Sequence, residues 1–205
     1  MPNPSEILAG LAAISNEMKF LAIVCHIVIG LWIVALVSGW RPTRRLAAIA
    51  LLLPLVSVGV LAWMYRNPFN GVVFLLAALG LAVMGSRLPK AKVEIRAGLY
   101  TAIGGVLVLF GWIYPHFVAG GSWLKYLYAS PVGLIPCPTL CVVTGFALIF
   151  KGFEARAPSL LLAALGIFYA VFGAFRLGVW IDIVLLAGAG ALFFQALKYR
   201  SAHSS

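Results

Sequence analysis

Long apolar stretches separated by short polar loops restrict what this sequence can fold into. A transmembrane helix needs about 20 mostly apolar residues. With 63% hydrophobic and only 10% charged residues, the 205-residue chain is too apolar for a water-soluble domain. The sequence therefore predicts an all-α fold, a polytopic transmembrane helix bundle of about seven spans. Six of them are residues 20–40, 46–65, 71–85, 97–114, 159–175 and 179–199, and the fifth span contains the Pro-Cys-Pro element and ends at residue 150.

The basic residues lie mainly in the loops between these segments and predict the orientation. If the N-terminus is outside, the inner side carries Arg41, Arg44, Arg45, Arg87, Lys90, Lys92, Arg96, Lys151, Arg156, Lys198 and Arg200. The outer side then carries Lys19, Arg66, Lys125 and Arg176. Loops on the cytoplasmic side are rich in Lys and Arg. The pattern predicts that the N-terminus is outside and the C-terminus inside. No basic stripe or RNA-binding motif accompanies the net charge of +10, so nucleic acid is not an expected partner.

The polar ends of the chain flank one transmembrane domain, residues 20–200. Residues 1–19 contain Glu6 and Glu17 and are too polar to span a membrane. Ser5 can cap a helix there, and the apolar residues that follow fall near one face: Ile7, Leu8, Leu11 and Ile14. This segment predicts an amphipathic helix at the membrane interface. Residues 201–205 are a polar tail. Small residues at 187–191 would allow close packing with neighbouring helices.

Two of the three cysteines lie in the Pro-Cys-Pro element that begins the fifth apolar segment. Pro138 suits the first position of a helix, and the residue before a proline avoids the helical region. Cys137 is therefore predicted to cap the helix, and Cys141 lies on roughly the same face. The helix dipole favours a thiolate at that position. The two thiols predict a soft-metal site or a redox pair, whereas burial as packing residues is the alternative.

Other reactive side chains lie near the same, outer side in this topology. Cys25 and His26 are about two turns from the outer end of the first segment, and His116 follows the fourth. Asp182 lies near the outer end of the last segment. Ionisable residues within spans are costly and usually face a cavity or each other, which predicts a shared polar pocket. Alternatively, His26 bonds to a neighbouring backbone and Asp182 pairs with Arg176.

The C-terminal third of the chain contains a more specific pattern. Residues 132–139 read VGLIPCPT, residues 158–161 read PSLL, and the final apolar segment is rich in Gly and Ala. The pattern resembles a family of bacterial multi-spanning membrane proteins of unknown function that carry a Gly-x-x-Pro-Cys-Pro-Thr element. The resemblance implies a multi-pass protein of the bacterial inner (plasma) membrane with a structurally important turn at this element. It implies no activity.

Three functions remain open, and the sequence does not decide whether the protein is an enzyme. The first is binding or transport of a soft metal ion (Cu, Zn or Hg-like), with Cys137, Cys141 and His116 as ligands and Cys25 or His26 completing the site. The second is a membrane thiol–disulfide oxidoreductase using Cys137 and Cys141, although cysteines four apart in a helix have poor disulfide geometry. The third is a non-catalytic scaffold or subunit. The lipid bilayer is the expected partner in each case, and a homo-oligomer or a partner subunit is compatible with all three.

Overall fold

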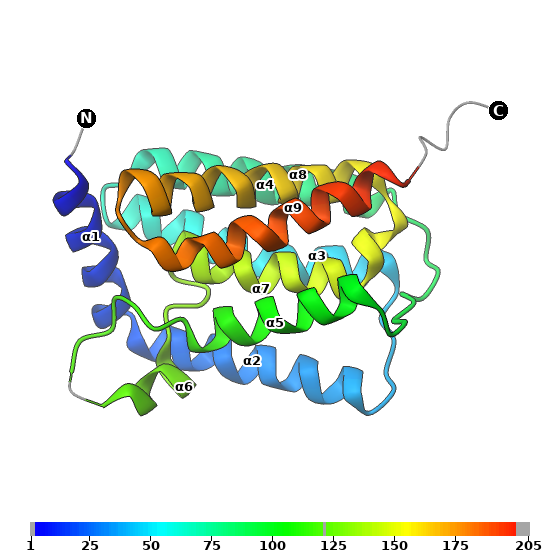
Figure 1. Ribbon diagram of the computed structural model, residues 1–205, viewed down its shortest axis with the longest axis horizontal. Coiled ribbons are helices and arrows are strands. Elements are labelled where there is room, and N and C mark those ends of the chain that lie inside the picture. Colours follow the sequence, from blue (N-terminus) through cyan, green and yellow to red (C-terminus); the bar gives the residue numbers. More distant parts are fainter. Residues whose placement is uncertain (1–2, 121, 200–205) are drawn as a thin grey trace.

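The protein is a bundle of antiparallel helices. The computed structural model describes residues 3–120 and 122–199, and these ranges contain helices and no β-strand (Figure 1). The predicted all-α class is confirmed for them. Each predicted apolar segment coincides with a helix: α2 (Lys19–Val37), α3 (Arg44–Met64), α4 (Pro68–Ser86), α5 (Leu99–Ile113), α7 (Pro136–Ile149), α8 (Arg156–Val171) and α9 (Ile183–Leu197).

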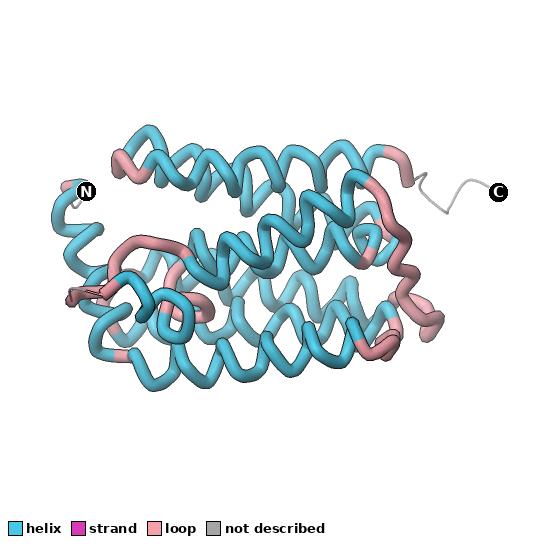
Figure 2. Tube along the Cα trace, turned by 60° about the horizontal axis from the view of Figure 1, so that its bottom comes forward, coloured by secondary structure: helices cyan, strands magenta, loops and turns pink. Residues whose placement is uncertain are grey.

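Within the described ranges, five helices are long and apolar enough to cross a membrane. They are α2, α3, α4 and two units that include the turns adjoining α8 and α9, Arg156–Arg176 and Trp180–Leu197. Helix α5 has 15 residues and α7 has 14. The helices lie side by side along the long axis, and the loops gather at the two ends (Figure 2). Shorter elements are η1 (Trp123–Lys125), α6 (Tyr126–Ala129), η2 (Lys151–Glu154), η3 (Phe172–Arg176) and η4 (Trp180–Asp182).

Helix α7 is the centre of the bundle. Twelve of its 14 residues are buried. Glycines bring its backbone against that of α5: a Cβ on Gly104 would lie 2.6 Å from the Gly145 carbonyl oxygen, and a Cβ on Gly145 would lie 2.7 Å from the Gly104 carbonyl oxygen. Gly111 approaches α7 in the same way, because its Cβ would lie 2.7 Å from the Pro138 carbonyl oxygen. Small residues are what allow membrane helices to pack this closely.

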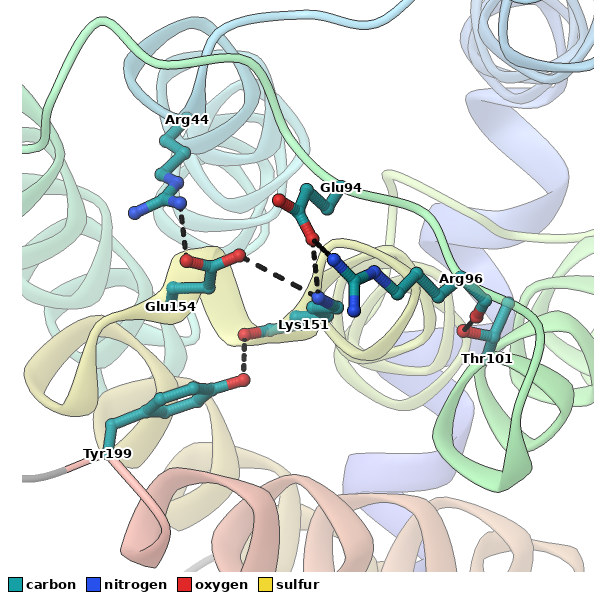
Figure 3. Close-up of polar contacts among 7 residues, drawn as sticks. All are labelled: Arg44, Glu94, Arg96, Thr101, Lys151, Glu154 and Tyr199. Carbon is teal, nitrogen blue, oxygen red and sulfur yellow. Dashed lines mark hydrogen bonds and ion pairs between the residues drawn. The ribbon is translucent and has the colours of Figure 1, made fainter.

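Ion pairs join the most basic loops at one end of the bundle (Figure 3). Arg44 pairs with Glu154, and the Glu94 carboxylate lies 2.8 Å from the Lys151 ammonium and 2.9 Å from the Arg96 guanidinium. The hydrogen bond from Lys151 and the charge of Arg96 lower the pKa of the Glu94 carboxyl, so it is ionised at neutral pH. These contacts bring together the start of α3, the loop between α4 and α5, and the turn between α7 and α8.

Helix α1 (Pro4–Glu17) runs across the opposite end, at a steep angle to the bundle helices (Figure 1). Its cap is Asn3, whose side chain accepts from the Glu6 N–H while the Glu6 carboxylate accepts from the Asn3 N–H. The prediction that Ser5 caps this helix is therefore wrong. The helix begins earlier because Pro4 suits its first position. The apolar residues Leu11 and Ile14 are buried against protein.

Candidate functional site

The Pro-Cys-Pro-Thr residues form the first turn of α7. Ile135 is extended (φ −128°, ψ 160°) and is the cap residue, and Pro136 takes the first helical position. The prediction that Cys137 caps the helix is wrong, because Cys137 is already helical. Both prolines are tolerated because the first-turn N–H groups have no intrahelical acceptor, so losing two of them removes no helical hydrogen bond.

Hydrogen bonds from Thr139 fix the approach to this turn. Its hydroxyl donates to the Ile135 carbonyl oxygen (2.7 Å) and accepts from the Gly133 N–H (2.8 Å). Gly133 has φ +77°, a left-handed conformation that favours glycine. A Cβ at this position would also lie 2.5 Å from Cys25 Sγ. Gly133 and Thr139 of the motif therefore shape the turn, and Cys25 packs directly against it.

Three side chains from different parts of the chain meet beside the turn. The Tyr114 hydroxyl, after α5, donates to Asp182 Oδ1 at 2.6 Å, and both residues are buried. The Cys137 thiol donates to the Tyr169 carbonyl oxygen, with 3.9 Å between sulfur and oxygen, and it lies near the Asp182 carboxylate. Cys141, one turn further along α7, is fully buried. We call Tyr114, Cys137 and Asp182 the thiol–carboxyl centre.

The end of α8 is shaped around the carboxylate of this centre. Its last turn, η3, is π-helical, and Gly173 in that turn lies so close to Asp182 that any Cβ would overlap the carboxylate. The Gly173 carbonyl oxygen accepts from the Val179 N–H (2.9 Å), which closes the chain toward α9. Single π-helical turns are rare and frequently occur at functional sites. Here the turn makes room for a buried acid.

His26 lies apart from these contacts and is held by the backbone. Its Nδ1 is 2.8 Å from the Ala22 carbonyl oxygen and its Nε2 is 2.9 Å from the Trp112 carbonyl oxygen. The imidazole also packs edge-on against the Trp112 ring, with the ring centroids 4.9 Å apart. Both ring nitrogens thus face backbone oxygens. These contacts agree with the alternative interpretation of His26 in the sequence.

Two other predicted pocket residues lie on the surface. His116 is exposed in the loop after α5, where its ring packs edge-on against Phe117. Arg176 is exposed at the end of η3, and no ion pair joins it to Asp182 in the described ranges. Across residues 3–120 and 122–199, no group of three or more His, Cys, Asp or Glu side chains is placed to hold a metal ion.

Two polar partners inside the bundle are not predicted from the sequence. Tyr114 stands at the end of an apolar segment, and its hydroxyl is the donor to Asp182. Asn70 is the second, and its Oδ1 accepts from the buried Tyr169 hydroxyl at 2.8 Å. An acidic side chain within a span needs a hydrogen-bond donor, so Asp182 in the sequence indicates that a donor exists. The pattern along the chain does not say which of the seven tyrosines supplies it.

Comparison with known proteins gives no further guide to the site. No protein-family model, curated protein or solved structure matches this chain. The resemblance in the C-terminal third therefore stays a prediction. The function has to be argued from the contacts of the thiol–carboxyl centre.

Proposed function

We propose that this chain is a seven-span protein of a bacterial inner membrane that binds a soft metal ion at the thiol–carboxyl centre. The observation that carries the proposal is the position of the Cys137 thiol near the buried Asp182 carboxylate, which accepts a hydrogen bond from the Tyr114 hydroxyl. A thiol binds a soft ion after losing its proton, and a carboxylate in contact with it can accept that proton. Thiolates select ions such as Cu(I) and Zn(II).

The ligand set differs from the one that the sequence suggests. Cys137 and Asp182 supply the first sulfur and oxygen, and Cys141 on the same helix supplies the second sulfur. Because these side chains do not form a three-ligand group in the described ranges, binding requires their rotation around an incoming ion. His116, on the surface loop, would have to move further to join them, so we assign it no ligand role in this proposal.

The proposed topology has the N-terminus and α1 outside and the C-terminus inside. Contacts among the basic loops support this topology, because they place these loops at one end of the bundle. Cytoplasmic loops are the ones that carry such positive charge. We expect a reporter fused after Ser205, which lies outside the described residues, to be active only in the cytoplasm. A reporter inserted after Asn67, at the opposite end, is the control and should be active only in the periplasm. The reverse result would contradict the orientation.

Metal binding is tested on the purified protein in detergent, loaded with Cu(I) or Zn(II) and measured by elemental analysis. We expect one ion per chain in the wild type and none in Cys137→Ser. Cys25→Ser is the matched control, since it makes the same chemical change outside the centre, and it should bind normally. Asp182→Asn should also weaken binding, because it removes the oxygen ligand and the carboxylate that accepts the thiol proton.

A non-catalytic membrane scaffold is the second candidate, and a specific observation favours it. Polar groups in the bundle already satisfy one another, as in the bonds of His26 to two backbone carbonyls and of Tyr169 to Asn70. A wild-type protein that binds no metal after loading would contradict the metal proposal. Reversible oxidation of Cys137 and Cys141 in that protein would then favour the oxidoreductase, and its absence would favour the scaffold.

A further inference from the structure

We infer that α1 is a lid that controls access to the thiol–carboxyl centre from the end of the bundle where α7 begins. This lid rests on the proposed function only for the identity of the species that it admits to the centre, a soft metal ion. Three kinds of observation support the lid. They are the apolar contacts of α1, the hydrogen bonds of Asn16 and Glu17, and the connection of α1 to α2.

The apolar face of α1 packs on the segments that bear the centre. Leu11 and Ile14 belong to a buried cluster with Ile135, and the partly buried Phe117 and Leu177 pack against this cluster. Ile135 lies two residues before Cys137, Phe117 lies three residues after Tyr114, and Leu177 lies five residues before Asp182. The cluster that α1 joins therefore includes a residue from each of the three segments that lead to the centre. A purely interfacial helix would instead turn these residues toward lipid.

Hydrogen bonds from Asn16 fasten the C-terminal end of α1, beside Met18. Its side-chain amide donates to the Phe117 carbonyl oxygen (2.9 Å) and its Oδ1 accepts from the Ala119 N–H (2.8 Å). The Phe117 ring in turn stacks parallel to the Tyr114 ring, with the ring centroids 6.4 Å apart. The Asn16 bonds thus hold α1 to the loop that continues directly from the hydroxyl donor of the centre.

A third bond ties the lid to α3, and a single residue ties it to α2. The Tyr65 hydroxyl donates to the Glu17 carboxylate at 2.7 Å. Met18 alone separates α1 from α2 and is the cap residue of both helices, with no side-chain cap on α2. Rotation at Met18 would therefore swing α1 as a unit without breaking helical hydrogen bonds. Among the described residues, opening would break the contacts of α1 with the cluster and the hydrogen bonds of Asn16 and Glu17.

The test measures how fast the Cys137 thiol reacts with a charged, water-soluble maleimide in the purified full-length protein, with the modified cysteine identified by peptide mass. Asn16→Ala removes the two hydrogen bonds from α1 to the loop after α5, and we expect Cys137 to react about tenfold faster or more. Tyr65→Phe removes the bond to Glu17 from the α3 side, and we expect a smaller increase. Ser5→Ala, at an exposed position on the same helix, is the control and should react like the wild type.

The maleimide rates test the lid independently of whether the protein binds metal. An unchanged Cys137 rate in both Asn16→Ala and Tyr65→Phe would overturn the lid, whether or not the wild type binds metal. Equal acceleration at Cys25, Cys137 and Cys141 would also overturn it, because it would indicate general loosening of the bundle. Faster reaction confined to Cys137 in a protein that binds no metal would support the lid and contradict the metal site.

Discussion

Replacing Gly104 with alanine is expected to destabilise the protein by about 1–3 kcal/mol, the usual cost of inserting a methyl group into a closely packed core. The new Cβ would lie 2.6 Å from the Gly145 carbonyl oxygen and 2.9 Å from Ile149. The carbonyl belongs to the backbone of α7 and cannot rotate away as a side chain would. Helices α5 and α7 must therefore separate. Thermal unfolding in detergent, followed by circular dichroism, measures the loss.

The neighbouring glycine of α5 provides a matched control. A Cβ on Gly105 meets nothing within 4 Å. Alanine is favoured over glycine inside a helix by about 1 kcal/mol, so Gly105→Ala should leave the unfolding temperature unchanged or raise it. The same chemical change one residue apart thus has opposite expected signs. Equal effects at the two positions would contradict the backbone contact between α5 and α7.

Tyr114→Phe is expected to destabilise the protein by about 1–2 kcal/mol. Hydrogen bonds to charged groups contribute about 1.5–3 kcal/mol, whereas side-chain hydrogen bonds inside a membrane protein average less, about 0.6 kcal/mol with a maximum near 1.7. We place the expected loss where these ranges meet because the Asp182 carboxylate is buried inside the bundle. Thermal unfolding at constant pH measures it.

Tyr128→Phe is the control for this hydroxyl deletion. The Tyr128 side chain is exposed near α2, so the same change there should alter stability by less than about 0.5 kcal/mol. Asp182→Asn should then lower the free energy of unfolding less in the Tyr114→Phe variant than in the wild type, because the two side chains share one hydrogen bond. Fully additive losses would mean that the hydroxyl and the carboxylate do not interact.

The helices were predictable from the sequence because the bilayer imposes a simple requirement on each span. Residues such as Arg41 and Arg87 end the apolar segments, and the corresponding helices end within a few residues of them. The cap of α7 was not predictable, because Pro136 and Pro138 each satisfy the rule for a first turn. Only the packing of Ile135 and Thr139 distinguishes the two registers.

The candidate site was predictable only in part. Asp182 stands out as a charged residue in an apolar segment, and Cys137 stands out by its flanking prolines. Their contact was not predictable, because it depends on how the ends of α7 and α9 pack. Tyr114 is 68 positions from its acceptor, and no local pattern links the two. His116 was grouped with the cysteines by predicted depth alone, and depth does not fix where a side chain lies around the bundle.

The burial of α7 has a consequence for how the protein is made. A helix of 14 residues is about 21 Å long, shorter than the roughly 30 Å hydrocarbon core of a bilayer. During synthesis it leaves the ribosome before α8 and α9, which later cover two of its sides. Until then α7 is a poor candidate for independent insertion. In the proposed seven-span topology, we therefore expect α7 to integrate stably only after α8 and α9 have been made, because both pack against it.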